Sequence, residues 1–171
     1  MSLLEHARRM AAYNRWMNER LYERCATLSE EERRRDMGAF FRSVHGTLNH
    51  ILLADRVWMG RFLGEPFVAD SLDQELYADF ATLRAERERE DARIIAWVEG
   101  LSPETLEGEL CYTSMVNPEP RRYPYALTVS HFFNHQTHHR GQLTTLLMQL
   151  GHDPGVTDLI WLPEAAVGAR S

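Results

Sequence analysis

The sequence predicts an all-α fold, an up-down four-helix bundle with a long loop before the last long helix. Apolar residues recur every three or four positions along four long segments, which is the spacing of one buried helix face. Clusters of glycine, proline and serine separate these segments. Helices that each hide one apolar face form a bundle most simply, and 44% hydrophobic residues are enough to fill its core.

The first long helix is expected from residue 3 to about residue 25. Its seam alternates steps of four and three and consists of Leu3, Ala7, Met10, Asn14, Met17 and Leu21. Asn14 is the polar member of this seam. One interpretation is a buried amide bonded to a neighbour, and the other is a contact to a ligand or substrate. Ser29 precedes three glutamates, which is typical of a helix N-cap, and it predicts a short helix that ends at Gly38.

The second and third long helices are expected at about residues 40–62 and from residues 71–73 to about residue 99. The second helix carries an inward stripe formed by Phe41, Val44, Leu48, Ile51, Asp55, Trp58 and Phe62. His45 and His50 flank this stripe and do not lie in it. The inner side of the third helix is marked by Leu76, Phe80, Leu83, Arg87, Ile94, Trp97 and Leu101. Its residues 84–93 are charged nearly all round, which predicts a solvated face with ion pairs one turn apart.

Residues 103–124 contain four prolines and predict a long loop with room for a hairpin. Loops of this length in compact domains are often functional. The last long helix is expected at residues 125–150, because Gly151 suits the position after a helix end. Residues 156–163 are expected to pack back on the bundle through Leu159, Ile160 and Trp161.

Composition argues against several classes of protein. The formal net charge of −6 argues against a nucleic-acid-binding surface, and the arginines at residues 33–35 are flanked by acidic residues. No apolar segment reaches the roughly 20 residues of a membrane span. Two cysteines make neither a disulfide framework nor a zinc knuckle, so a cytoplasmic protein with reduced thiols is expected. One domain is expected over residues 1–164, with a flexible tail over residues 165–171.

A pair of histidines in the last helix is the strongest sign of chemistry. The buried stripe of that helix consists of Phe132, His135, His139, Leu143, Leu146 and Leu150. His135 and His139 lie one turn apart on one face, so both imidazoles can reach one ion, as the histidines of the H-E-x-x-H motif do. Gln136 stands where that motif has its glutamate, which argues against a metalloprotease. Two core histidines bonded to neighbours are the alternative to a metal site.

Several short motifs follow one another in an order that covers nearly the whole chain. They are residues 13–16 (YNRW), residues 48–52 (LNHIL) with Asp55 and Trp58, residues 134–142 (NHQTHHRGQ), and Gly151 with Asp158 and Leu159. With these motifs the sequence resembles the DinB/YfiT-like family of metalloenzymes, and residues 134–142 are the most specific of them. The family shares only a name with a translesion polymerase, and nothing in the residues indicates a polymerase.

The resemblance implies a four-helix bundle, often dimeric, in which three histidines hold a divalent metal ion. The matching residues are His50, His135 and His139, so the resemblance selects His50 over His45, a choice that the apolar spacing leaves open. Three neutral imidazoles leave a coordination position open for water or substrate, as in catalytic zinc sites. Zinc or nickel is the expected ion, because imidazole suits both and the resemblance favours them.

The surroundings of the three histidines are expected to form a pocket. His138 points about 100° away from His139 around the helix and is expected outside or at the mouth. His131 is expected in the pocket, and residues 103–124 with the start of the last helix are expected to form its rim. Aromatic candidates for the lining are Tyr13, Trp16, Trp58, Tyr112 and Tyr125, and candidate acids include Asp55 and Glu99.

Three functions stay open at this point. The first is an enzyme for a small-molecule substrate, either a hydrolase or a transferase. The superfamily implied by the resemblance includes transferases and isomerases that use low-molecular-weight thiols. The second is a non-catalytic metal-binding or stress-response protein, and the third is a structural bundle whose histidines satisfy one another. A homodimer is also expected, from the resemblance and from the aromatic surplus of Phe40, Trp58, Phe62 and Trp97.

Overall fold

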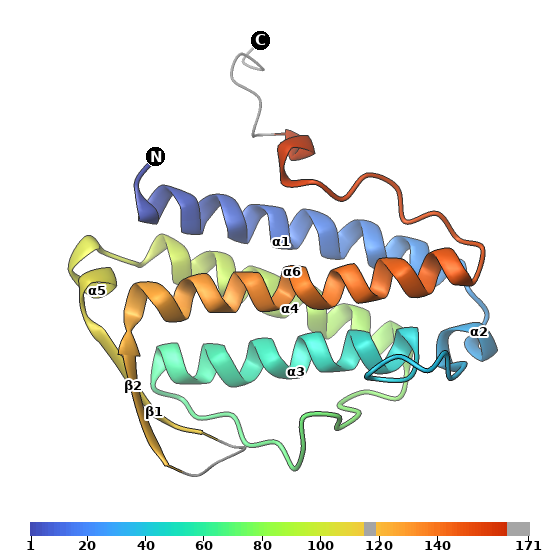
Figure 1. Cartoon of the computed structure of the whole chain (residues 1–171), viewed down its shortest axis with the longest axis horizontal. Helices are drawn as coiled ribbons and strands as arrows, with labels where there is room; N and C mark the ends of the chain where they lie inside the picture. The colour runs from blue at the N-terminus through green and yellow to red at the C-terminus, as the bar shows by residue number, and fades with distance from the viewer. Residues whose placement is uncertain (115–118, 164–171) are drawn as a thin grey trace.

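The computed structural model describes residues 1–114 and 119–163 and is mostly helical (Figure 1). Its elements are α1 (Leu3–Ala26), α2 (Glu30–Arg34), α3 (Val44–Leu63), α4 (Phe80–Glu99), α5 (Pro103–Glu107), β1 (Glu109–Thr113), β2 (Pro120–Pro124), α6 (Tyr125–Gln149) and a 3₁₀ turn (Leu159–Trp161). Strands β1 and β2 pair antiparallel as a hairpin. The fold is therefore not strictly all-α, because the segment predicted as a loop contains a helix and this small sheet.

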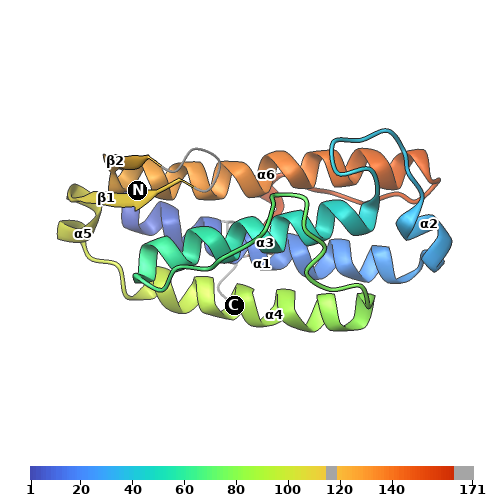
Figure 2. The same cartoon turned by 90° about the horizontal axis from the view of Figure 1, so that it is seen from below.

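Four long helices lie side by side, and each packs against two others (Figure 2). Helix α1 packs on α4 and α6, and α3 packs on the same two helices. Helices α1 and α6 run in one direction, while α3 and α4 both run in the other (Figure 1). The up-down order that the sequence predicts is therefore wrong, since the two middle helices are parallel. Parallel neighbours need a long crossover, as in bundles with one long connection.

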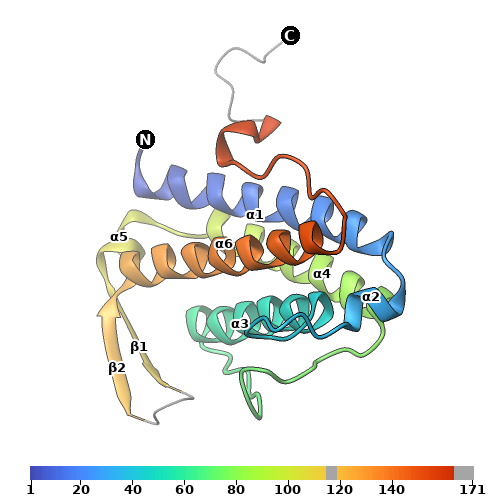
Figure 3. The same ribbon diagram turned by 45° about the vertical axis from the view of Figure 1, so that its right-hand side comes forward.

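The crossover between α3 and α4 is residues 64–79, which run back along the outside of α3 (Figures 1 and 3). The sequence predicts helix from residues 71–73, but α4 begins only at Phe80. Asp79 is its N-cap and accepts a hydrogen bond of 2.7 Å from the backbone N–H of Thr82. Asn49 on α3 bonds both the N–H and the C=O of Tyr77, at 3.0 and 3.2 Å. These bonds give the backbone N–H and C=O of Tyr77 the hydrogen-bond partners that a helix would otherwise supply.

Helix α3 begins at Val44, four residues later than predicted, because a tight turn precedes it. Ser43 is the N-cap and accepts a hydrogen bond of 3.0 Å from the N–H of Gly46. A Cβ at Gly46 would meet the carbonyl oxygen of Phe41 at 2.2 Å, so only glycine allows this approach. Arg42 in the same turn has φ +65°. The turn places Phe41 against the outer side of α3.

The segment after α6 packs back on the bundle, but with different residues from those expected. Leu159 packs against the core and Leu162 is buried. Ile160 and Trp161 are 77% and 62% exposed, so the prediction is right for Leu159 and wrong for these two. The tail predicted over residues 165–171 lies outside the described residues. Among the described residues, no helix is both long and apolar enough to cross a membrane.

A layer of buried polar side chains divides the core into two apolar halves. On α4, Leu83 belongs to one apolar cluster and Ile94 to the other, and Arg87 and Asp91 lie between them along the helix. Arg87 is only 2% exposed, as its place on the predicted inner side of this helix implies. Glu90 and Asp91 are also buried, so the prediction that residues 84–93 form a solvated face is wrong at these two acids. We call this layer the buried ionic layer; its members are Asn14, Asn18, Asp55, Arg87, Asp91, Gln136 and Arg140.

Candidate metal centre

Three histidines from two helices converge on one point. His50 lies on α3, and His135 and His139 lie one turn apart on α6, as the sequence predicts for that pair. The Nε2 atom of His139 is 3.3 Å from Nε2 of His50 and 3.1 Å from Nε2 of His135. One ligand atom from each of the three lies within 4.8 Å of the others, so the group could hold a metal ion. We call these three residues the histidine cluster.

Hydrogen bonds fix which ring nitrogen of two cluster members carries its proton. Nδ1 of His50 lies 2.8 Å from the carbonyl oxygen of Leu72 in the crossover. Nδ1 of His139 lies 2.9 Å from the side-chain Oε1 of Gln142, one turn further along α6. Both oxygens can only accept, so each Nδ1 donates and each Nε2 is left with a lone pair. Such a bond to the far nitrogen is typical of metal-ligating histidines.

The cluster is held in its neutral form. Burial lowers the pKa of His50 to about 4, although the bond to Leu72 opposes this shift. Burial, followed by the neighbouring His139 and His50, lowers the pKa of His135 to about 3. Burial also lowers the pKa of His139, against the bond to Gln142. Neutral imidazole is the form that binds a metal ion.

The geometry fits a cation better than it fits a self-contained hydrogen-bond network. When His50 and His139 donate through Nδ1, their Nε2 atoms face each other as two acceptors at 3.3 Å. Two acceptors at this distance repel one another unless a proton or a cation lies between them. A proton is disfavoured because the pKa values are low. The facing lone pairs of His50 and His139, with Nε2 of His135 3.1 Å from that of His139, therefore fit a divalent metal ion with nitrogen ligands.

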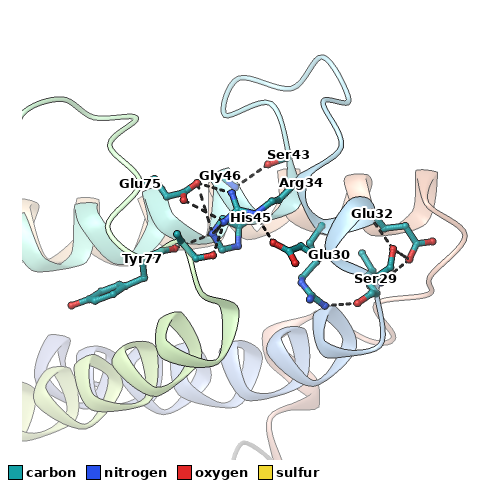
Figure 4. A network of polar contacts seen from close by, with 12 residues as sticks. Ser29, Glu30, Glu32, Arg34, Ser43, His45, Gly46, Glu75 and Tyr77 are labelled. Atoms are coloured by element: carbon teal, nitrogen blue, oxygen red, sulfur yellow. Dashed lines mark hydrogen bonds and ion pairs between the residues drawn. The ribbon is translucent and has the colours of Figure 1, made fainter.

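His45, the other candidate on α3, is bound elsewhere (Figure 4). Its Nε2 lies 2.9 Å from the carbonyl oxygen of Tyr77 and 3.3 Å from Nη2 of Arg34. The carboxylate of Glu75 is 3.9 Å away. His45 thus ties the end of α2 and the crossover to α3, and it contributes nothing to the histidine cluster.

An aromatic ring and a pocket adjoin the cluster. Phe41, from the turn before α3, stacks on the ring of His50 with centroids 3.7 Å apart. On another side lies a pocket of about 210 Å³, and its lining includes His50, Trp58, Arg61, Tyr112, His131 and His135. Tyr112 comes from strand β1, so residues 103–124 contribute to the pocket as expected. His131 lines it too and is itself exposed to solvent, whereas the exposed His138 is not part of the lining.

The candidate acids do not reach the cluster. Glu99 is exposed and pairs with Arg8 at 3.2 Å. Asp55 is buried and accepts hydrogen bonds from Arg87 at 2.6 Å and from Gln136 at 3.0 Å. Both oxygens of Asp55 are therefore engaged within the buried ionic layer.

The buried ionic layer links all four long helices. Arg87 on α4 contacts Asp55 on α3 at 2.6 Å and Asp91 at 2.9 Å. Asn14 and Asn18 on α1 donate to Asp91 at 3.0 and 2.9 Å, which bears out the interpretation of Asn14 as a buried amide bonded to a neighbour. On α6, Gln136 donates to Asp55 and Arg140 donates to Asn14.

Sequence reasoning missed three contributors to the site. Gln142 lies three residues after His139 on the same helix, so its contact to His139 is readable from helical spacing. Phe41 falls in the predicted inward stripe, but the stacking on His50 depends on the turn before α3. The carbonyl of Leu72 has no sequence signal, because any residue supplies a carbonyl and the crossover sets its position.

Comparisons with known proteins agree with this fold. A family model described as the DinB family matches residues 1–170. The chain is 26% identical to protein DinB of Bacillus subtilis (strain 168) over 166 residues, which cover 90% of this chain and 91% of that protein. A crystal structure of a DinB-like protein from Bacillus cereus ATCC 10987 is similar with a TM-score of 0.61 and 21% identity, covering 82% of this chain and 90% of that one. This last likeness concerns the fold alone.

Proposed function

This chain belongs to the DinB family, and from that premise we propose that it is a metal-dependent enzyme with one divalent ion held by His50, His135 and His139. The observation that carries the proposal is the convergence of three Nε2 atoms, two of them with the opposite nitrogen tied to an oxygen acceptor. The alternative of histidines that satisfy one another is less favoured, because the contact between Nε2 of His50 and Nε2 of His139 then has no donor.

Zinc or nickel is the ion that we propose. Three imidazoles match the nitrogen ligands of catalytic zinc sites, in which an open position takes water or substrate. Nickel accepts the same ligands, so the donor set does not separate the two ions. Neither cysteine belongs to the histidine cluster, which leaves a purely nitrogen donor set.

The reaction that we propose is either hydrolysis of a small-molecule substrate or transfer of a low-molecular-weight thiol to such a substrate. A bound ion of this type supplies a water or thiolate that is deprotonated near neutral pH. The chain's own residues position and enclose the substrate. Phe41 covers one side of His50, and the pocket beside His135 admits only a small molecule. His131 in that pocket is neutral, because burial and then Arg61 lower its pKa, so it can accept a proton from the substrate.

A non-catalytic metal-binding or stress-response protein is the second candidate. It is favoured by the pocket lining, which contains no carboxylate among the described residues. An enzyme of this kind must then use His131 or a metal-bound group as its base. Turnover of a thiol or ester panel by the metal-loaded protein would separate the two candidates.

We also propose a homodimer. Phe40 is 82% exposed beside the turn before α3, and Ile160 and Trp161 are exposed after α6. The other members of the predicted aromatic surplus are at least half-covered within one chain. Light scattering at micromolar concentration tests the dimer, and a monomer there would contradict it.

Elemental analysis after gentle purification tests the metal site itself. We expect about one equivalent of a divalent metal per chain, since three histidines hold one ion. A content below about a tenth of an equivalent, with no uptake of added zinc or nickel, would overturn the proposed function.

A further inference from the structure

Among the half-buried and buried arginines that the structure describes, Arg61 on α3 and Arg20 on α1 have no oxygen partner, and of these two only Arg61 lies beside the histidine cluster. Arg87 pairs with two carboxylates, and Arg56 pairs with Glu86 at 2.5 Å. Arg61 makes no hydrogen bond or ion pair with any of the residues that the structure describes. It nevertheless lines the pocket beside the histidine cluster.

Two aromatic rings hold the guanidinium of Arg61. Its central carbon lies 4.5 Å from the ring centroid of Trp58 and 4.1 Å from that of Tyr112. Such contacts occupy the faces of the planar group and leave its N–H donors at the edge. Burial lowers the pKa of Arg61, while Tyr112 acts in the opposite direction. The lowered pKa means that the guanidinium charge is partly shielded from water. A charge held in this way is costly unless its donors meet an acceptor.

The space next to Arg61 has two parts. The pocket of about 210 Å³ contains Arg61, His50 and His135 in its wall. A neighbouring pocket of about 300 Å³ shares Trp58, Tyr112 and His131 with the first. Its other lining residues are Tyr123, Leu127 and Thr128. The second pocket, which we call the aromatic pocket, offers flat apolar surface and no charged group apart from the titratable His131.

We propose that Arg61 binds the carboxylate of a small organic acid, whose apolar body lies in the aromatic pocket and whose reacting group faces the histidine cluster. Only the placement of the reacting group rests on the proposed function. A planar guanidinium edge matches a carboxylate with two parallel hydrogen bonds. Arg61 is the only charged side chain in the described walls of both pockets, since His131 is neutral. A single negative charge therefore matches the site better than a phosphate dianion.

Calorimetric titration of the zinc-loaded protein tests this assignment with three probes that share a phenyl ring and differ in their polar group. The probes are benzoate, its uncharged analogue benzamide, and phenyl phosphate. We expect benzoate to bind most tightly, and Arg61→Gln to weaken benzoate at least about tenfold while it changes benzamide little, because a hydrogen bond to a charged group is lost. Arg89→Gln, an exposed arginine on α4, is the matched control and should bind benzoate as the unchanged protein does.

Three outcomes overturn the proposal. The first is equal benzoate affinity in Arg61→Gln and the unchanged protein. The second is benzoate binding that disappears on removal of zinc and ignores Arg61, which would place the carboxylate on the metal. The third is phenyl phosphate binding more tightly than benzoate, which would replace the monocarboxylate class. If Arg61→Gln unfolds, Arg61→Lys keeps the charge and loses the planar edge, and it must still weaken benzoate relative to benzamide.

The experiment distinguishes failure of the proposed metal site from failure of the proposed carboxylate site. Zinc content is measured in every sample, and Arg61→Gln should load zinc as the unchanged protein does, since Arg61 is not in the histidine cluster. If the protein takes up no metal but still prefers benzoate in a way that depends on Arg61, the anion site stands and the metal site falls. Normal zinc uptake without that preference gives the reverse result.

Discussion

The histidine cluster and the buried ionic layer lie on the same stretches of α3 and α6, yet they are built in opposite ways. His50 and Asp55 are five residues apart, and His139 and Arg140 are adjacent. In the ionic layer, Arg87 lies between two carboxylates, and donors meet acceptors across all four long helices. In the histidine cluster, the lone pair on Nε2 of His50 faces the lone pair on Nε2 of His139.

This difference separates a structural polar group from a ligand site. In the ionic layer the buried charges of Arg87, Asp55 and Asp91 are offset by one another, although single atoms such as Nε of Arg87 and Nε of Arg140 have no hydrogen-bond partner among the described residues. The two facing acceptors of His50 and His139 have no such offset among the described residues. A count of polar residues would not distinguish the two regions, because both are buried and both include members from α3 and α6.

The largest expected effect comes from breaking the histidine cluster. His135→Ala removes one of the three proposed metal ligands, and we expect the metal content to fall from about one equivalent to less than about a tenth. His138→Ala is the control, because its ring is exposed on another side of α6 and should leave the metal content unchanged. Elemental analysis of both variants makes the measurement. Retained metal in His135→Ala would show that the ion is bound elsewhere.

Breaking the ionic layer should reduce stability. Arg87→Leu leaves Asp55 and Asp91 buried without their cation, so we expect a loss of about 3–5 kcal/mol in the free energy of unfolding. Denaturant unfolding of the metal-free protein measures it, with the exposed Arg89→Gln as a control that should change by less than about 0.5 kcal/mol. A loss below about 1 kcal/mol in Arg87→Leu would contradict the account of the layer as matched charges.

Acidification should destabilise the metal-free protein through the histidine cluster more than through the buried ionic layer. The folded protein holds His50 and His135 with pKa values of about 4 and about 3, whereas the unfolded chain takes up protons near the ordinary value of 6.5. Protons thus favour the unfolded state, and the metal-free protein should lose stability as the pH falls from about 6.5 towards 4. We expect a loss of roughly 4 kcal/mol between pH 7 and pH 5, to which the two histidines contribute nearly equally.

Denaturant unfolding at several pH values, with the metal removed, checks this prediction. His135→Ala lacks one of the depressed pKa values and should show a smaller loss over the same range. Equal stability of the unchanged protein at pH 7 and pH 5 would mean that the histidines are not held neutral.

The smallest effect concerns a residue that only orients a ligand. Gln142→Ala removes the acceptor for Nδ1 of His139, and we expect metal affinity to weaken about tenfold without loss of the site. Competition with a chelator of known affinity measures the change. Gln149→Ala, near the end of α6, serves as the control. Unchanged affinity in Gln142→Ala would mean that His139 is oriented by packing against Phe41 alone.

What the sequence predicts well is local. Helix existence and the pairing of His135 with His139 follow from spacing within one element, and both are found. The order of the helices depends on the crossover at residues 64–79, where bonds from Asn49 to Tyr77 override helical propensity. Spacing also places Arg87 on the inner side of its helix, but the pairing of Arg87 is non-local, since its partner Asp55 lies 32 residues away on another helix. The choice of His50 came from the resemblance to a family, and spacing alone did not make it.

The separation of the cluster along the chain has a consequence for biosynthesis. His50 and His139 are 89 residues apart, and nearly all of the crossover, α4 and the hairpin lies between them. During synthesis from the N-terminus, the complete donor set exists only after α6 has left the ribosome and docked on α3. Closing so long a loop carries an entropic cost that packing of the helices must offset first. Metal binding is therefore expected to follow folding. A bound ion would then be found only on fully synthesised, folded chains, and it would not direct their folding.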